Sequence, residues 1–266
     1  ILKEVDRIWR KHKIKYLLDA GTLIGAIRHK GFIPWDDDVD IAFMRADYEK
    51  FIKVAPGELS EDIHLLLSKD IGGGKVFYDF TPKLVYKKSR KTGENEETRF
   101  YGNELNHICV DLFIIDDISE NKFSRTMQVL LMKMVYGLAM GHRWKLDYSK
   151  YKGLAQAQVR VLASIGKCIP MEKIYRLEAK MAIRQNKQNS RLCYYSNYDP
   201  GYTHMLFKKA WSEHVINVKF EGYELMAPKG YDKVLKTVYG EYMTPPPEDK
   251  RAPSHGDLED EGFYVL

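Results

Sequence analysis

An acidic run that leads into an apolar strand constrains this chain more than any other feature. Four of the five residues at positions 36–40 are aspartates, and an apolar strand is predicted over 39–43. Asp38 and Asp40 are two residues apart, so on a strand their side chains point to one face of the sheet, while Val39 and Ile41 point into the core. The run therefore predicts a sheet with a pair of carboxylates at one end of a strand.

These paired carboxylates favour a metal site. Two carboxylates a few ångströms apart repel each other at neutral pH, and a divalent cation removes that repulsion. Mg²⁺ prefers a few carboxylates together with phosphate oxygens and water. The alternative is an acidic turn that water solvates. Ile33 and Trp35 place apolar side chains beside the acids, which favours a binding site over the solvated turn.

Asp111 is the third acidic candidate, because it interrupts an apolar strand predicted within residues 108–115. A buried, unpaired carboxylate is costly, and a metal shared with Asp38 and Asp40 would offset that cost. The alternative is an aspartate that points to solvent, which strand alternation allows. Apolar neighbours on both sides favour the buried position. We therefore predict that Asp38, Asp40 and Asp111 hold Mg²⁺ or Mn²⁺ and form the catalytic centre.

Gly21 ends a predicted strand over 14–20, and Thr22 begins a short predicted helix over 22–29. Backbone N–H groups at the start of a helix can hold phosphate oxygens. The alternative is structural, because turns from a strand to a helix often require glycine. Their position directly before the acidic strand favours a phosphate-binding role.

The remaining pattern predicts an α+β fold in one chain of 266 residues. Residues 1–117 are predicted to form a mixed α/β catalytic core, with further strands at 63–67, 76–80 and 83–86 and a polar loop over 88–98. Residues 118–200 are predicted to form a helical subdomain, with helices over 123–144, 151–169 and 171–188. Residues 201–266 are predicted to add a β-hairpin around Glu221-Gly222 and a helix over 231–239, both packed back on the core.

Composition excludes several classes of protein. The net charge is +5 and the basic residues are scattered, which fits anionic substrates or an anionic membrane but gives nucleic-acid binding little support. The three cysteines form no C-x-x-C pair, so a disulfide framework and a structural zinc site are disfavoured and a reducing compartment is expected. The most apolar stretch, 127–140, falls short of the roughly 20 residues that span a bilayer. A buried helix is the favoured interpretation, and a helix on a membrane surface is the alternative.

The motif as a whole resembles the signature of the LicD family. The resemblance is carried by Gly21-Thr22, Arg28-His29 and the run Gly31-Phe32-Ile33-Pro34-Trp35-Asp36-Asp37-Asp38-Val39-Asp40. A C-terminal stretch from Tyr239-Gly240 through Pro245-Pro246-Pro247 and Arg251 to His255 is also similar to the ending of that family. LicD proteins belong to the nucleotidyltransferase-fold superfamily, as do the fukutin-related proteins. The resemblance therefore implies a nucleotidyltransferase-like core, in which Gly21-Thr22, Asp38, Asp40 and Asp111 match the superfamily pattern.

The resemblance also implies an activity. LicD proteins are similar to enzymes that move a phosphocholine group from cytidine diphosphate-choline (CDP-choline) to a sugar hydroxyl of a cell-surface glycan, such as a teichoic acid. The metal would bind the donor phosphates, and Asp111 would help to deprotonate the acceptor. Arg28, Lys83, Arg251 and His255 are candidates for contacts with the donor phosphates, although each fits an ordinary surface cation as well. Tyrosines and tryptophans could enclose a quaternary ammonium by cation–π contact.

Two alternatives stay open at this point. The transferred group could be ribitol phosphate, glycerol phosphate or phosphoethanolamine, because the sequence pattern does not identify the donor pocket. From another class, the chain could be a metal- and glycan-binding protein without catalysis, although the complete set of three carboxylates argues against this. The expected location is the cytoplasm, with contact to the inner face of the membrane where the acceptor is lipid-linked.

Overall fold

A mixed β-sheet forms the centre of the protein. The computed structural model describes residues 1–92, 96–187, 189–200, 205–251 and 263–265. Within them the main sheet has the order β1–β2–β6–β4–β3, and β7 and β8 extend it along β6. Only β2 and β6 run parallel, whereas the other neighbouring strands are antiparallel. The strands are β1 (Leu17–Leu18), β2 (Asp40–Met44), β3 (Ile63–Leu66), β4 (Lys83–Tyr86), β6 (Ile108–Ile118), β7 (Leu192–Tyr195) and β8 (Phe207–Lys208).

The long strand β6 organises this sheet. β2 pairs with residues 111–115 along one edge of β6, while β4 and β7 pair with its two ends along the other edge. The buried side chain of Asn197 fills the gap between β4 and β7. Its Oδ1 accepts from the Ile114 amide at 2.8 Å, and its Nδ2 donates to the Leu112 carbonyl at 3.0 Å. A side-chain amide thus provides hydrogen bonds along this edge of β6, between the segments that pair with β4 and with β7.

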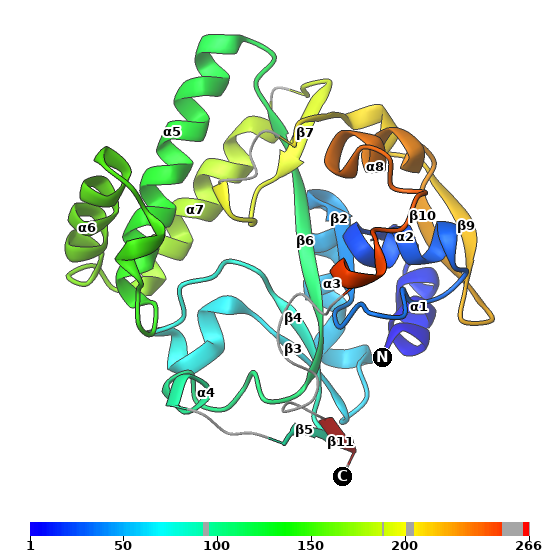
Figure 1. The fold of residues 1–266 in the computed structure, drawn as a ribbon. Coiled ribbons are helices and arrows are strands. Elements are labelled where there is room, and N and C mark those ends of the chain that lie inside the picture. The colour runs from blue at the N-terminus through cyan, green and yellow to red at the C-terminus, as the bar shows by residue number, and fades with distance from the viewer. Residues whose placement is uncertain (93–95, 188, 201–204, 252–262, 266) are drawn as a thin grey trace.

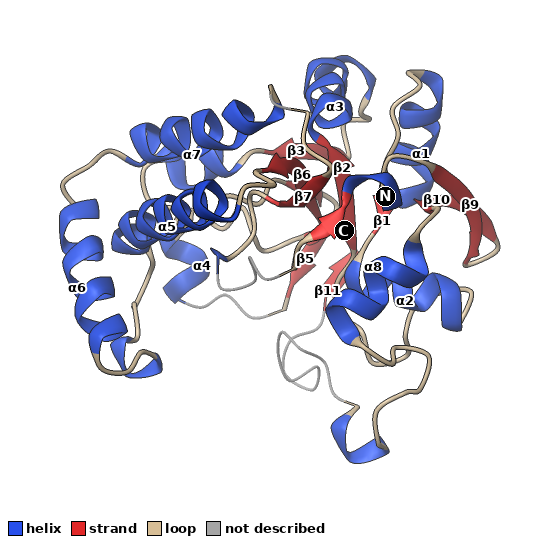
Figure 2. Cartoon of the chain, turned by 90° about the horizontal axis from the view of Figure 1, so that it is seen from above, coloured by secondary structure: helices blue, strands red, loops and turns tan. Residues whose placement is uncertain are grey.

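Helices cover the sheet in two groups, on either side of β6 (Figures 1 and 2). One group comprises α1 (Leu2–Lys11), α2 (Ala20–Arg28), α8 (Tyr231–Tyr239) and the hairpin β9 (Val215–Phe220) and β10 (Tyr223–Pro228). The other comprises α5 (Lys122–Ala139), α6 (Leu154–Gly166) and α7 (Met171–Asn186). The remaining elements are α3 (Arg45–Glu58), α4 (Glu96–Phe100) and the two-stranded pair of β5 (Ser89–Lys91) and β11 (Phe263–Val265). This arrangement confirms the predicted α+β class.

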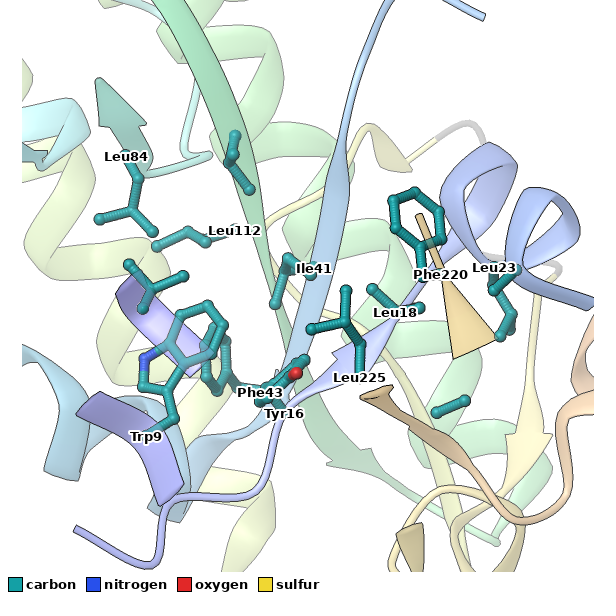
Figure 3. Close-up of a cluster of buried hydrophobic side chains, with 14 of the residues drawn as sticks. Trp9, Tyr16, Leu18, Leu23, Ile41, Phe43, Leu84, Leu112, Phe220 and Leu225 are labelled. Atoms are coloured by element: carbon teal, nitrogen blue, oxygen red, sulfur yellow. The ribbon is translucent and has the colours of Figure 1, made fainter. Parts of the chain in front are cut away.

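The main core lies beneath α1, α3 and the hairpin (Figure 3). The buried Trp9 ring contacts Tyr16, with the two ring centroids 4.5 Å apart. Phe43 of β2 stacks on Phe51 of α3. Because successive strand residues alternate, the buried Ile41 and Phe43 pack into this core and hold β2 in a fixed position. The core thereby fixes the strand that begins with Asp40.

The predicted hairpin and C-terminal helix are confirmed. Glu221 and Gly222 join β9 and β10 with positive φ angles of 50° and 79°, as a tight hairpin turn requires. Phe220 and Leu225 from the hairpin, and Leu235 from α8, are buried in the main core. The C-terminal segment therefore completes the core.

Two local predictions were wrong. Residues 76–80 form no strand, because Phe77 and Phe80 are buried in two separate clusters that pull the segment out of the sheet. The polar run 88–98 is not simply a loop, since β5 and the start of α4 fall within its described part.

The helices expected over 118–200 are α5, α6 and α7, whereas β7 within the same range joins the main sheet. The division into three domains stays a prediction. No helix in the described part of the chain combines the length and apolar character that crossing a membrane requires.

Glu178 on α7 provides a pH-dependent element of stability. Burial raises the pKa of Glu178 from 4.5 to about 8, and the nearby Arg45 only partly opposes this. Between these values the folded chain binds a proton that the unfolded chain has released, so stability falls as pH rises from about 4.5 to 8. Glu178→Gln should therefore raise Tm at pH 8 and make Tm depend less on pH. The expected rise is ~2–4 °C for each kcal/mol gained in the free energy of unfolding.

Thermal unfolding followed from pH 5 to pH 8.5 checks this prediction. Glu172→Gln, at an exposed position on the same helix, serves as the matched control. A Glu178→Gln profile parallel to that of the wild type would show that Glu178 is ionised in the folded protein.

Candidate active site

Three charged side chains form a row across the centre of the sheet. Asp40, the first residue of β2, lies directly opposite Asp111 in the parallel pairing of β2 with β6. Lys83, the first residue of β4, lies opposite Asp111 from the other side. The sheet therefore brings two of the predicted catalytic carboxylates and one predicted phosphate-binding cation into neighbouring positions.

Lys83 and Asp111 form an ion pair in this row. The Lys83 Nζ lies 2.5 and 2.7 Å from the two carboxylate oxygens of Asp111. Burial alone would lower the pKa of Lys83, but the Asp111 carboxylate outweighs it and raises that pKa well above its ordinary value. The predicted surroundings of Asp111 were wrong, because its side chain is 28% exposed and is paired. Lys83 thus gives the Asp111 carboxylate a counter-ion within the protein.

Several other carboxylates surround Asp40. Its side chain is buried, and burial raises the pKa of Asp40 well above its ordinary value. Repulsion from Asp38, Asp111, Asp19 and Asp36 raises it further. So many carboxylates around one buried position fit a divalent cation, whose charge would relieve both the burial and the repulsion.

Asp36, Asp37 and Asp38 form a compact group of carboxylates. Each offers a ligand atom, and these atoms lie within 4.8 Å of one another, the one such acidic cluster in the part of the chain that the structure describes. Asp40 and Asp111 lie outside this cluster, so the metal set Asp38, Asp40 and Asp111 stays a prediction. Asp36 and Asp37 were not predicted as ligands, although their place in the acidic run was a signal for them.

The loop over residues 29–39, which carries the three carboxylates and is called the acidic loop below, connects α2 to β2. Two glycines on one face of α2 allow this loop to lie against that helix. A methyl group added at Gly21 would come within 2.4 Å of the Asp36 Oδ2. One added at Gly25 would come within 2.4 Å of the Gly31 carbonyl oxygen. Only a residue without a side chain permits such a close approach. These glycines therefore bring the acidic loop to the first turn of α2.

Thr22 joins α2 to β2. Its side chain is buried, and its Oγ1 accepts from the backbone amide of Asp40 at 3.0 Å. Thr22 therefore helps to fix the start of β2. The structure shows the Asp36 carboxylate beside Gly21, and the predicted phosphate contacts of Gly21 and Thr22 stay predictions.

Two predicted phosphate-binding arginines, far apart in the chain, come together beside the acidic loop. The Arg251 guanidinium lies over the Trp35 ring, with 5.1 Å from its Cζ to the ring centroid. Arg28 donates from Nη1 to the Tyr242 carbonyl at 2.6 Å. Partial burial, together with repulsion from Arg251, lowers the pKa of Arg28. A phosphate would relieve this repulsion. His255, the fourth predicted cation, lies outside the described residues.

A cavity of about 220 Å³ opens beside Asp40. Aromatic rings form much of its wall, and both Asp19 and Asp40 line it. The aromatic residues are Phe113, Tyr195, Tyr198 and Tyr239. The sequence had indicated aromatic residues without identifying which ones line the site.

Asp19 is a residue of this cavity that sequence analysis missed. It directly precedes α2 and is buried. Its Oδ1 accepts from the Tyr195 hydroxyl at 2.7 Å. Burial raises the pKa of Asp19 to about 6. The only signal in the sequence was a single acid at the end of an apolar strand, which is common in structural turns.

Comparison with known proteins shows which sequences this chain resembles. Residues 13–133 match the family model described as the LicD/FKTN/FKRP nucleotidyltransferase domain. The chain is 30% identical to the lipopolysaccharide cholinephosphotransferase LicD of Haemophilus influenzae, over 96% of this chain and 92% of that protein. An uncharacterized protein of Rickettsia typhi is 43% identical over 56 residues, which is 21% of this chain and 18% of that protein.

Proposed function

Since this chain belongs to the LicD family, we propose that it transfers a phosphocholine group from CDP-choline to a sugar hydroxyl of a bacterial cell-surface glycan. The Haemophilus relative is named as a cholinephosphotransferase that acts on lipopolysaccharide, which supports both the transferred group and a glycan acceptor. The finer acceptor class that we propose is a teichoic acid or a similar phosphate-rich glycan.

The aromatic cavity beside Asp40 is the observation that carries this proposal. A quaternary ammonium cannot donate a hydrogen bond, so proteins bind it with aromatic faces and nearby negative charge. Phe113 and Tyr198 pack edge to face with ring centroids 5.2 Å apart, and Asp19 and Asp40 supply carboxylates to the same cavity. Four aromatic residues beside two carboxylates provide this environment, which supports choline as the transferred group.

The charged residues of the site would bind the metal and the phosphates of the donor. We propose that Asp38, Asp40 and Asp111 hold Mg²⁺ or Mn²⁺, with Asp36 and Asp37 close enough to assist. The metal would neutralise the charge of the donor diphosphate. Arg28 and Arg251, with Lys83 and His255 as further candidates, would bind phosphate oxygens.

The bonding changes of the proposed reaction are simple. The acceptor oxygen forms a bond to the phosphorus of phosphocholine as the bond from that phosphorus to cytidine monophosphate (CMP) breaks. Asp111 lies between Asp40 and Lys83 in the charged row and is 28% exposed, and it is the proposed acceptor of the hydroxyl proton. CMP then departs with the electron pair of the broken bond. The proposed location is the cytoplasm, where nucleotide donors are made.

Tyr239 offers a sharp test of the choline pocket. Tyr239→Leu removes a ring from the cavity, whereas Tyr239→Phe keeps the ring and removes only the hydroxyl. A cation–π contact of about 1–2 kcal/mol predicts that Tyr239→Leu weakens CDP-choline binding ~5–30-fold. Tyr239→Phe should stay within about twofold of the wild type because the ring face remains.

Isothermal titration calorimetry with CDP-choline and CDP-glycerol, both in Mg²⁺, measures the difference. Tyr223→Leu, at an exposed position in the hairpin, is the control. Equal weakening of both donors by Tyr239→Leu would show that the cavity does not recognise choline.

A further inference from the structure

Helix α5 has two apolar faces, and only one of them packs against the protein. Met132, Val135 and Ala139 are buried beneath it. A second stripe follows the spacing i, i+4, i+7 and i+11 along the outer face. Its members are Phe123, Met127, Leu130 and Met134, which are 77%, 42%, 51% and 44% exposed. A surface helix normally carries polar residues on this face, so the outer stripe requires an explanation.

Helix α6 carries a matching stripe. Leu154, Val161 and Ile165 are 75%, 58% and 49% exposed and follow the spacing i, i+7 and i+11. An open groove of about 780 Å³ runs between the two helices, lined by Leu130 and Met134 from α5 and by Leu154 and Val161 from α6. Both helices lie in the group on the far side of β6 from the hairpin (Figures 1 and 2). We call these two stripes and their groove the α5–α6 face.

The charge around this face is mainly positive, although Asp199 also lines the groove. Between positions 121 and 170 the sequence contains nine lysines and arginines, no glutamate and a single aspartate, Asp147. Lys122 and Lys133 of α5, and Lys152 and Lys167 at the two ends of α6, are exposed. The whole chain has a net charge of only +5, so its basic excess is concentrated here. Exposed Phe, Leu and Met side chains among lysines match an anionic lipid surface.

We propose that the α5–α6 face docks on the surface of an anionic bilayer. The apolar stripes would enter the boundary between headgroups and acyl chains, while the lysines would contact anionic headgroups. Charge complementarity favours this occupant over a second copy of the chain, because two such faces would bring their lysines together. The docking itself does not depend on the activity proposed above.

The position of the face also suggests what docking achieves. Pro200 lines the groove of the α5–α6 face, and Tyr198, two residues earlier, lines the cavity beside Asp40. A membrane-bound face would therefore hold the catalytic cavity next to the bilayer. This step rests on the proposed function, since it implies an acceptor whose glycan is attached to a lipid.

Vesicle flotation tests the docking. Vesicles of phosphatidylglycerol and phosphatidylcholine in equal parts should capture the protein at least ~10-fold better than phosphatidylcholine alone, and added salt should weaken the capture. The double variant Phe123→Ser with Leu154→Ser should lower capture by ~10-fold or more. The control is Tyr223→Ser with Met243→Ser, at positions outside this face that are 50% and 48% exposed.

Three outcomes would overturn the proposal. They are failure of the anionic vesicles to capture the protein, equal capture of the Phe123→Ser/Leu154→Ser variant, and a dimer in light scattering that this variant dissociates. The variant should keep the wild-type Tm and the wild-type affinity for CDP-choline, because its substitutions are exposed and outside the catalytic cavity. If the wild type binds vesicles but does not bind CDP-choline, the proposed function is rejected and the docking of the α5–α6 face is not.

Discussion

Replacing Asp40 by asparagine is expected to abolish transfer while stabilising the metal-free protein. Asparagine keeps the shape of the side chain and the hydrogen bond from the backbone amide of residue 40 to Thr22. It removes the carboxylate that the other aspartates surround. Loss of a charged group that stabilises metal and donor phosphates should lower kcat/KM by about a thousandfold or more. Removing a buried, repelled carboxylate should raise Tm in EDTA, because active-site charge is often held at the expense of stability.

Two measurements separate these effects. Release of CMP from CDP-choline in the presence of a glycan acceptor reports transfer, and thermal unfolding in EDTA reports stability. Asp62→Asn, which removes an aspartate from an exposed ion pair with Lys88, should leave both unchanged. An Asp40→Asn variant that retains transfer would remove Asp40 from the catalytic centre. A lower Tm in EDTA would show that Asp40 has a structural role.

Replacing Asp116 by alanine is expected to cause the largest loss of stability. The Asp116 carboxylate is fully buried in β6 and accepts from the Arg45 Nε at 2.9 Å. It also accepts hydrogen bonds from Asn186 on α7 and from Ser196. It thereby ties α3, β6 and α7 together. Removing one partner leaves the Arg45 guanidinium mostly buried without its counter-ion, at a cost of about 3–5 kcal/mol.

Urea unfolding measures this cost as a lower midpoint with an unchanged slope. Asp62→Ala, which breaks the exposed pair with Lys88, is the matched control and should have little effect because solvent screens that pair. Similar midpoints for the two variants would show that the Arg45–Asp116 pair does not hold the helices to the sheet.

Local pattern was sufficient for much of the fold. Alternation of side chains along 39–43 placed Ile41 in the core, and the pair Glu221-Gly222 identified the hairpin, because both signals depend on neighbouring residues alone. The segment 76–80 shows the limit of this reasoning. Its composition fits a strand, but burial of Phe77 and Phe80 in different clusters is a tertiary effect that overrides propensity.

The parts of the candidate site that sequence could not predict all depend on pairing between distant segments. The ion pair of Lys83 with Asp111 results from the register of β4 against β6, which neither strand specifies alone. The proximity of Arg28 to Arg251 likewise requires the C-terminal segment to return to α2. Asp19 acquires its significance only when the fold brings Tyr195 and Tyr239 to the same cavity.

Metal-dependent recognition of CDP-choline is the central proposal, and one titration tests it most directly. CDP-choline is titrated calorimetrically into the wild-type protein in Mg²⁺ and again in EDTA, with Asp38→Ala in Mg²⁺ as the comparison. We predict saturable binding by the wild type in Mg²⁺ that is at least about tenfold weaker in EDTA and in the variant, because each loses charge neutralisation at the donor phosphates. Binding of equal strength in all three titrations, or no binding in any of them, would contradict the proposed phosphocholine transfer at this site.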